Sequence, residues 1–471
     1  MKTTAVMCLP CPVEGRRATF DATSNGLHIR QVDIARPDPA ETQLSSDTMI
    51  AHFLGASALI LVAAHAGGWL ARQLRQPYIV GQLAVGIVLG PSLLGSMAPD
   101  VYAYLFPPAI GPALTGFAQF ALVLFLFAVG YELDLKVLGD RARTSVTVAL
   151  ASFVGPMAVG SGCALLFQDA LRELGMPPDL SPAMVVFAGV ALSITAVPVL
   201  SAIVRENELS RSVPGIVAVS AAGVLDAVCW TVLAAALLEH GDSTSALDWP
   251  WRVVLAVCFV TVMAFAARPV LRRLLWRARM EPSLRLALLI GFALGSAWVT
   301  HSLGLHLIFG ALLAGAVVPR EANGTLDPDL LRPLHEVSSL LLPFFFVLSG
   351  QTVALDSMTS TGWGALLVVT LLAVTTKVGC GTAAARLGGL GRHDARTVGV
   401  LLSARGLTEL IALNAGLQAG LLSVPLYTVL VFMALATTLL TQPLLLLTRR
   451  LAARDRTACP VPDTIAKPYA R

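Results

Sequence analysis

Four charged residues stand inside long apolar stretches of this sequence: Asp226 in AVSAAGVLDAVCWTVLAA, Lys377 in LLAVTTKVGCG, and Arg405 with Glu409 in LLSARGLTELI. Placing a charge in hydrocarbon is costly, so such residues mark functional sites in membrane proteins. An aspartate can bind a proton, or, when ionised, it can offer a hard oxygen ligand to Na⁺ or K⁺. Because both compete for one carboxylate, their movements become coupled. We therefore predict that Asp226 binds the proton and a transported monovalent cation.

Each of these residues also has a purely structural interpretation. Asp226 could pack against another helix with its carboxylate bonded to hydroxyls, and Lys377 could extend its ammonium group to the membrane surface. Arg405 and Glu409 are four residues apart, so on a helix they could neutralise each other. In the functional interpretation, Lys377, Arg405 and Glu409 are supporting charges around the ion site.

Two of the apolar stretches contain residues that interrupt helices. Thr195-Ala-Val-Pro198 includes a proline, which removes a backbone hydrogen bond inside a helix. Ser403-Ala-Arg405-Gly406 includes a glycine, which tolerates a break in the backbone. Broken helices would present half-helix ends, with partial charges of both signs, near the middle of the membrane. Thr195 and freed carbonyls would then add oxygen ligands to that of Asp226, with Pro198 and Gly406 marking the breaks.

The composition excludes a water-soluble fold. Of the 471 residues, 56% are hydrophobic and only 13% are charged, and the net charge is +4, whereas soluble domains have about a quarter charged residues. Only helices and closed barrels cross hydrocarbon, and these long apolar runs lack the alternation of barrel strands. We expect a lipid bilayer as surroundings and no nucleic-acid partner.

The sequence predicts an all-α membrane protein of about thirteen spans: 50–71, 78–95, 113–131, 145–167, 183–204, 214–238, 252–270, 284–301, 304–319, 337–353, 362–385, 395–419 and 424–447.

Three segments follow from this division. Residues 1–48 form a polar N-terminal tail that we expect to be disordered, 49–448 form the membrane domain, and 449–471 form a short cytoplasmic tail, with no soluble regulatory domain expected at either end. Every second connecting loop is basic, from Arg72 and Arg75 after the first span to Arg449 and Arg450 after the last. Lys and Arg favour the cytoplasmic side, and the alternation stays in phase only for an odd number of spans. We therefore expect the N-terminus outside and the C-terminus in the cytoplasm.

An internal repeat relates the two halves of the membrane domain. GQLAVGIVLGP at 81–91 resembles GALLAGAVVP at 310–319, and LFLFAVGYELDL at 124–135 resembles FFFVLSGQTVAL at 344–355. These matches pair span 2 with span 9 and span 3 with span 10. Because the offset of seven spans is odd, the copies have opposite orientations, and inverted repeats are a signature of secondary transporters. The same offset pairs the interrupted spans 5 and 12.

These motifs together resemble a known family. RQPYIVGQLAVGIVLGPSLLG (75–95), LFLFAVGYELDL, SITAVPVLSAIV (193–204), GVLDAVCW (223–230), HLIFGALLAGAVVPR (306–320), LLPFFFVLSG (341–350) and LLSARGLTELI (401–411) are similar, in the same order, to the bacterial monovalent cation:proton antiporter-2 family. This family contains sodium/proton exchangers and Kef-type potassium systems. The resemblance covers about residues 50 to 447.

The resemblance implies a sodium/proton antiporter fold with two crossed broken helices, a homodimer in the inner (plasma) membrane, and elevator-like alternating access. It places the essential aspartate on Asp226, the first broken helix on Thr195 to Val199, the core lysine on Lys377 and the arginine of the second broken helix on Arg405. One departure matters: Leu225 stands where sodium exchangers usually have Asp or Asn. With a single titrating carboxylate, we expect one-for-one, electroneutral exchange of Na⁺ or K⁺ for H⁺.

Other functions remain open from the sequence. A gated K⁺ efflux channel would conduct without proton coupling, an exporter would remove an organic cation or ionophore for self-resistance, and a sensor would not transport at all. An enzyme is not expected, since no span carries a nucleophile with a matching base or a metal-ligand set. No cofactor is expected either.

Overall fold

The chain folds almost entirely into helices, as the long apolar runs predict. The computed structural model describes residues 17–23, 26–32, 39–74, 76–132, 142–240, 249–277, 281–303, 306–319 and 328–458. A two-stranded antiparallel hairpin, β1 (Arg17–Thr23) and β2 (Gly26–Val32), precedes the first helix. The expected tails, 1–48 and 449–471, lie partly outside the described residues, as does Arg75.

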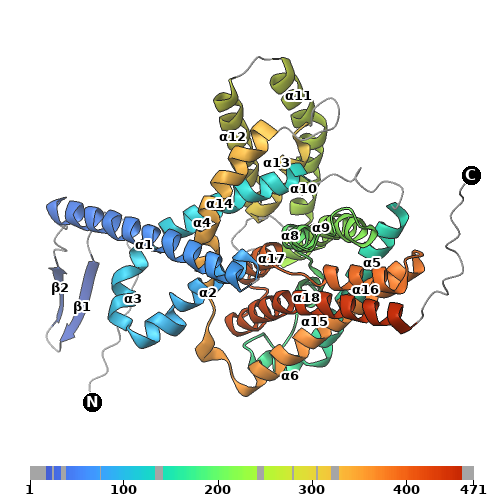
Figure 1. Cartoon of the computed structure of the whole chain (residues 1–471). Helices are drawn as coiled ribbons and strands as arrows, with labels where there is room; N and C mark the ends of the chain where they lie inside the picture. The colour runs from blue at the N-terminus through green and yellow to red at the C-terminus, as the bar shows by residue number, and fades with distance from the viewer. Residues whose placement is uncertain are drawn as a thin grey trace, which may run out of the picture.

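The helices follow one another with short connections (Figure 1). In chain order they are α1 (Pro39–Gln73), α2 (Tyr78–Val88), η1 (Pro91–Gly95), α3 (Pro99–Leu105), η2 (Pro108–Ile110), α4 (Gly111–Glu132), α5 (Ala142–Leu166), α6 (Gln168–Glu173), α7 (Pro182–Ser193), α8 (Val197–Glu206), α9 (Val213–His240), α10 (Trp249–Val262), η4 (Met263–Ala267), α11 (Arg268–Arg277), α12 (Pro282–Ser302), α13 (Leu307–Val317), α14 (Pro328–Gln351), η5 (Leu355–Ser357), α15 (Ser360–Leu387), α16 (Arg392–Leu402), α17 (Leu407–Gln418) and α18 (Val424–Ala458).

Each of the thirteen expected spans coincides with one helix or with two or three consecutive helices. Within the described residues, eleven helical segments are long and apolar enough to cross a membrane, or twelve when the bent pair α16 and α17 counts as one. The remaining expected span is the shorter apolar helix α13. The prediction of an all-helical membrane fold is thus confirmed. The short helices α3 and α6 were not expected from hydropathy.

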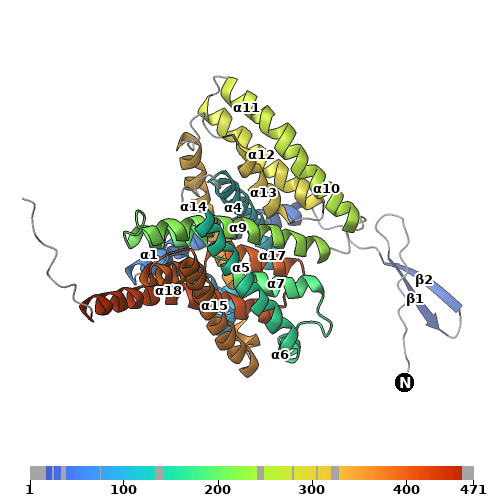
Figure 2. The same cartoon turned by 90° about the vertical axis from the view of Figure 1, so that its right-hand side faces the viewer.

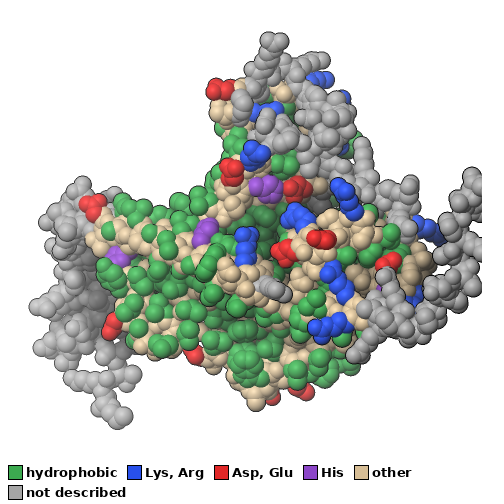
Figure 3. Space-filling model, viewed as in Figure 1, with side chains coloured by type: hydrophobic (Ala, Val, Ile, Leu, Met, Phe, Trp, Pro, Cys, Tyr) green, Lys and Arg blue, Asp and Glu red, His purple; other side chains and the backbone are tan. Residues whose placement is uncertain are grey.

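The surface of the helical body is suited to lipid. Figure 3 shows a face dominated by hydrophobic side chains, with charged side chains gathered on the right of the view and on the upper lobe. Large apolar side chains such as Val62, Val154, Leu367 and Leu446 are exposed. In water such an apolar surface would favour aggregation, whereas in a bilayer it contacts lipid chains.

Hydrogen bonds between helix ends sort the connections onto two opposite faces of the molecule. One set joins ends that adjoin the predicted basic loops: Glu132 with His335, Thr144 with Gly388, and Asn207 with Arg449. The other set joins ends at the alternate loops: Glu173 with Thr361, Leu174 with Ser423, Ser92 with Leu355, and His306 with Gln418. We call the first set's side the basic face and the other the opposite face. Each of these bonds joins two ends that the charge alternation assigns to the same side of the membrane.

The helices pack into two groups. The scaffold group comprises α1, α2, α4, α12, α13 and α14, and the core group comprises α5, α7, α8, α9, α15, α16, α17 and α18. Both views place α15 and α18 beside α5 and away from α12 and α13 (Figures 1 and 2). The helix run α10 to α11 contacts both α9 and α13. The site described below lies in the core group, against the scaffold group.

Equivalent glycine contacts express the inverted repeat inside the scaffold group. Gly86 of α2 packs against Gly350 of α14, and a Cβ on either would lie within 3.0 Å of the other helix's backbone. The equivalent residues of the other copies, Gly315 of α13 and Gly130 of α4, pack against each other's helix in the same way. The contact between span 2 and span 10 is thus repeated by the contact between span 9 and span 3, which are the equivalent spans of the other copies. Small residues at such crossings let backbones approach closely in membranes.

These contacts give a first prediction. Gly130→Ala is expected to destabilise the protein by ~1–3 kcal/mol, because the new methyl group would collide with the carbonyl of Leu312 and force the helices apart. Thermal unfolding of the purified protein in detergent measures the effect. Gly291→Ala is the matched control, since a Cβ at this lipid-facing position of α12 meets nothing within 4 Å. An equal melting temperature for both variants would contradict the assigned packing.

Candidate functional site

Two broken helices cross at the centre of the core group. The helical backbone stops after Ser193 and resumes at Val197, and it stops again after Leu402 and resumes at Leu407. The two breaks are hydrogen-bonded to each other: the Ala196 amide donates to the Ala404 carbonyl at 3.2 Å. The Thr195 hydroxyl also donates to the Leu402 carbonyl at 2.8 Å. The crossed, broken helices expected from the sequence are therefore present.

The local sequence explains both breaks. Pro198 lies in the first turn of α8, where its missing amide hydrogen costs nothing, whereas in a continuous helix its ring would clash with the Ile194 carbonyl. Gly406 is the N-cap of α17, and a Cβ there would press on the Val199 side chain of the other broken helix. Gly406 thus permits the close approach of the two broken helices, and Pro198 prevents α7 from continuing into α8 as one unbroken helix.

Two buried cations cap the end of α7. Arg405 donates to the Ala191 carbonyl at 2.5 Å and to the Leu192 carbonyl at 2.6 Å. Lys377 donates to the Ser193 carbonyl and, at 2.7 Å, to the Thr195 hydroxyl. The last carbonyls of a helix lack partners inside it and carry its negative dipole end, so cations are well placed there. Both side chains are at most 1% exposed.

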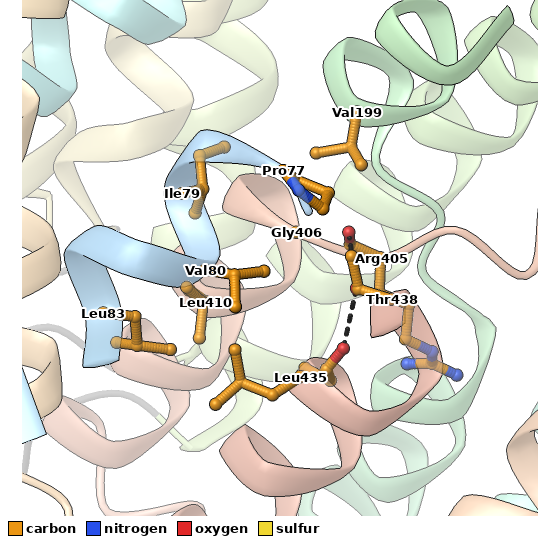
Figure 4. A pocket seen from close by; sticks show the side chains of 11 residues that line it. Pro77, Ile79, Val80, Leu83, Val199, Arg405, Gly406, Leu410, Leu435 and Thr438 are labelled. Atoms are coloured by element: carbon orange, nitrogen blue, oxygen red, sulfur yellow. Dashed lines mark hydrogen bonds between the residues drawn. The ribbon is translucent and has the colours of Figure 1, made fainter. Parts of the chain in front are cut away.

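Arg405 also forms a buried ion pair with Glu409, one turn along α17. The backbone carbonyl of Arg405 accepts a hydrogen bond from the Thr438 hydroxyl of α18 at 2.9 Å (Figure 4). The second carboxylate oxygen of Glu409 has no hydrogen-bond partner within the described part of the chain. Arg405 therefore joins α7, α17 and α18 through hydrogen bonds.

Asp226 lies midway along α9 and borders a small buried cavity. The side chain is only 1% exposed, and the cavity is very small, with about 10 Å³ of space for the centre of a water-sized molecule. Its lining comes from α9, from α17 and from the break after α7: Ile194, Asp226, Cys229, Trp230, Leu233, Thr408 and Ala412. Three polar atoms of this lining, Asp226 Oδ2, Trp230 Nε1 and Thr408 Oγ1, have no partner of standard hydrogen-bond geometry among the described residues, although the Trp230 indole lies close enough to Asp226 to interact with its carboxylate. Buried polar atoms without partners are costly, and clusters of them mark places that receive a water or an ion.

The buried charges balance. The charged residues that the described part of the chain buries are Asp226, Lys377, Arg405 and Glu409, two acids and two bases. Arg405 and Glu409 neutralise each other directly, but Lys377 is held by uncharged acceptors. Lys377 is thus held by other partners, since Leu225 stands at the position where a second carboxylate would pair with it. Asp226 has no buried cation as a hydrogen-bond or ion-pair partner among the described residues.

A second small cavity lies on the other side of the crossing. It is also very small, with about 20 Å³ of space for the centre of a water-sized molecule. It lies between α2 of the scaffold group and α8, α17 and α18 of the core group, as Figure 4 shows. Pro77 and Ile79 line it at the start of α2, near the basic face, and Arg405 and Gly406 line it at the break. The cavity at Asp226 extends instead along α9 and α17 towards the opposite face. The two cavities share no lining residue.

The residues predicted from the sequence gather at this crossing, with one difference in arrangement. Asp226, Lys377, Arg405 and Glu409 are all there, and Pro198 and Gly406 flank the breaks. Thr195 lies at the crossing as well, but its hydroxyl bonds to Leu402 and Lys377, and the residue does not line the cavity at Asp226.

Sequence reasoning missed Thr408 and Trp230. Both line the cavity with unpartnered polar atoms. Their signals were available: Trp230 is one helical turn after Asp226, and Thr408 is in the first turn of the helix that follows the second break.

Comparisons with known proteins agree with this architecture. The family "Sodium/hydrogen exchanger, transmembrane" matches residues 60–447. The chain is 34% identical over 413 residues to Cation/H(+) antiporter 18 of Arabidopsis thaliana, covering 84% of this chain and 49% of the relative, so it spans about half the length of that plant protein. It is 31% identical to the Na(+)/H(+) antiporter NhaS4 of Synechocystis sp., covering 80% of this chain and 92% of the relative.

A solved structure shares the fold. The sodium proton antiporter MjNhaP1 from Methanocaldococcus jannaschii superposes with a TM-score of 0.63 at 15% identity, covering 86% of this chain and 99% of that one. At this identity the likeness concerns the fold alone. The match of the family across most of the membrane domain decides the assignment: the chain belongs to the transmembrane sodium/hydrogen exchanger family.

Proposed function

We propose that the protein is a secondary active antiporter that exchanges one monovalent cation, Na⁺ or K⁺, for one proton. The observation that carries this proposal is the buried carboxylate of Asp226, with an unpartnered oxygen at a cavity beside two crossed broken helices. The names of relatives support both ions: NhaS4 is a Na(+)/H(+) antiporter, and K(+)/H(+) antiporter 1 of Saccharomyces cerevisiae is 29% identical over 411 residues.

Competition at Asp226 is the proposed coupling mechanism. A buried carboxylate is strongly disfavoured as a bare anion, so it must bind a proton or a cation before it can move through a low-dielectric region. Protonated, it has no charge to attract Na⁺ or K⁺, and with a cation bound it has no place for the proton. The carrier therefore crosses loaded with one or the other, and each crossing in one direction is matched by the other ion in return.

Electroneutral exchange follows from the same arrangement. Asp226 with a proton and Asp226 with a monovalent cation have the same net charge of zero. Lys377 and Arg405 are held by backbone carbonyls, and Arg405 is also paired with Glu409. Because these groups have no need to release a proton in either loaded form, the two half-cycles move equal charge. The membrane potential should then have no direct effect on the rate of exchange.

Movement of the core group against the scaffold group is the proposed access mechanism, an elevator. Small cavities on the two sides of the crossing support it, since each one marks a space that a short displacement could open to one face. The contact between the groups near the site is apolar: the Trp230 ring lies 6.3 Å from the Phe309 ring of α13. Apolar contacts can be exchanged during sliding without breaking ion pairs.

We further propose that the protein is a homodimer in the plasma membrane, with the basic face in the cytoplasm. The excess of Lys and Arg on the loops of the basic face supports this orientation. The resemblance to the antiporter family supports the dimer.

Proteoliposomes containing a trapped pH dye test the function directly. Addition of Na⁺, K⁺ or Li⁺ outside should raise the internal pH, as cations enter and protons leave. For the Na⁺ and Li⁺ additions, the membrane potential can be clamped with valinomycin and K⁺. The rate of proton movement should be the same whether the potential is clamped or left free. A cation current that persists without proton movement would instead indicate a channel. No response to any of the three cations, in vesicles where a known exchanger works, would refute the proposal.

A further inference from the structure

Thr408 shares the cavity with Asp226 and has an unengaged hydroxyl. The side chain is 1% exposed, it lies in the first turn of α17, and its Oγ1 has no hydrogen-bond partner within the described residues. The carboxylate across the same cavity also has an unpartnered oxygen. A hydroxyl and a carboxylate line one buried space without bonding to each other, and that space has room for about one species of the size of a water molecule.

Other polar groups near the cavity are poorer cation ligands. The hydroxyl of Thr195 already donates to Leu402 and accepts from Lys377, whose positive charge would repel an incoming cation. The Trp230 indole N–H lines the cavity but can only donate a hydrogen bond, so it cannot coordinate a cation. The Cys229 sulfur is a soft ligand and suits hard alkali cations badly. Asp226 and Thr408 are therefore the two side chains with oxygen ligands in this lining.

We propose that the Thr408 hydroxyl is the second protein ligand of the transported cation and that it determines how well the cation competes with the proton. The cation site then spans α9 and α17, and not α9 and the first broken helix. This inference rests on the proposed antiport function and adds to it the identity of a ligand and the class of substrate.

The two competing ions need Thr408 to different extents. An alkali cation loses part of its water shell in a buried site and requires several oxygen atoms in its place, whereas a proton on Asp226 forms a covalent bond to one oxygen. Removing the hydroxyl should therefore weaken cation binding and leave proton binding almost intact. The remaining walls, Ile194, Leu233 and Ala412, are apolar, and the cavity is small, which fits a small, partly dehydrated alkali cation and excludes a bulky organic one.

Thr408→Val is the decisive variant, because valine has nearly the same shape and lacks the hydroxyl. The apparent KM for Na⁺ or K⁺ should rise ~10–100-fold, the range expected when a polar group loses its partner in a site. Thr408→Ser, which keeps the oxygen, should restore most of the affinity. Thr231→Val is the matched control: Thr231 is on α9, five residues after Asp226, is exposed, and donates only to the Ala227 carbonyl.

A binding measurement separates this inference from the proposed function. Na⁺ or K⁺ should raise the melting temperature of the purified wild-type protein, Thr408→Ser and Thr231→Val, but raise that of Thr408→Val only at much higher concentration. If the wild type transports and Thr408→Val has an unchanged KM and an unchanged thermal response, Thr408 is not a ligand while the antiport function stands. If the wild type shows neither cation-driven proton movement nor cation stabilisation, the proposed function itself fails.

Discussion

Asp226→Asn is expected to abolish cation-driven proton movement in proteoliposomes. The amide has nearly the size of the carboxylate, so the cavity and the packing of α9 should be preserved. It cannot take up or release a proton at neutral pH and has no charge to hold a cation. With both partners of the exchange lost together, no residual coupled flux should remain at any cation concentration.

Two controls define this result. The variant should melt at or above the temperature of the wild type, since a neutral amide is less costly to bury than a carboxylate without a partner. Asp226→Glu should retain some exchange at a reduced rate, because the carboxylate is kept but pushed further into a very small cavity. Full exchange in the asparagine variant would show that another group carries the ions.

Arg405→Leu is expected to have the largest effect on stability. The substitution leaves Glu409 as a buried carboxylate without its cation and leaves the Ala191 and Leu192 carbonyls without donors. Breaking a buried ion pair by removing one partner costs ~3–5 kcal/mol. We expect low expression, or a large fall in the melting temperature measured in detergent.

A second substitution tests the cause. Glu409→Gln in the Arg405→Leu background removes the stranded charge and should recover part of the lost stability, whereas the orphaned carbonyls of α7 would remain. Glu409→Gln alone leaves Arg405 with its two carbonyl acceptors and should cost less than Arg405→Leu. Additive effects of the two substitutions would contradict a direct pair between Arg405 and Glu409.

The helices and their order could be predicted because hydropathy and charge alternation each report on the membrane. Runs of apolar residues as long as those around Asp226 and Lys377 have few alternatives to a spanning helix. The repeat could be detected because glycines recur at matched positions of its two copies, but the sequence did not show that Gly86 contacts α14 or that Gly130 contacts α13. The short helices α3 and α6 escaped this reasoning, since each has fewer than eight residues and leaves no long apolar run.

The site was predictable in its charges but not in its hydrogen bonds. A buried charge in a membrane is conspicuous in sequence, which is why Asp226, Lys377, Arg405 and Glu409 could be selected. Which acceptor holds Lys377 depends on the way the break after Ser193 turns its carbonyl, and sequence does not give that geometry. Thr195 and Thr408 look alike as threonines beside broken helices; only their neighbours in space distinguish the hydroxyl that braces the crossing from the one that faces the cavity.

The most direct test of the account is uptake of radioactive Na⁺ or the K⁺ analogue Rb⁺ into proteoliposomes, driven only by an imposed pH gradient, acid inside. The wild type should accumulate the cation while the gradient lasts, without help from the membrane potential, and Asp226→Asn should not accumulate it at all. Equal uptake by the wild type and Asp226→Asn, or uptake that ignores the pH gradient, would contradict the claim that one carboxylate carries the cation and the proton in turn.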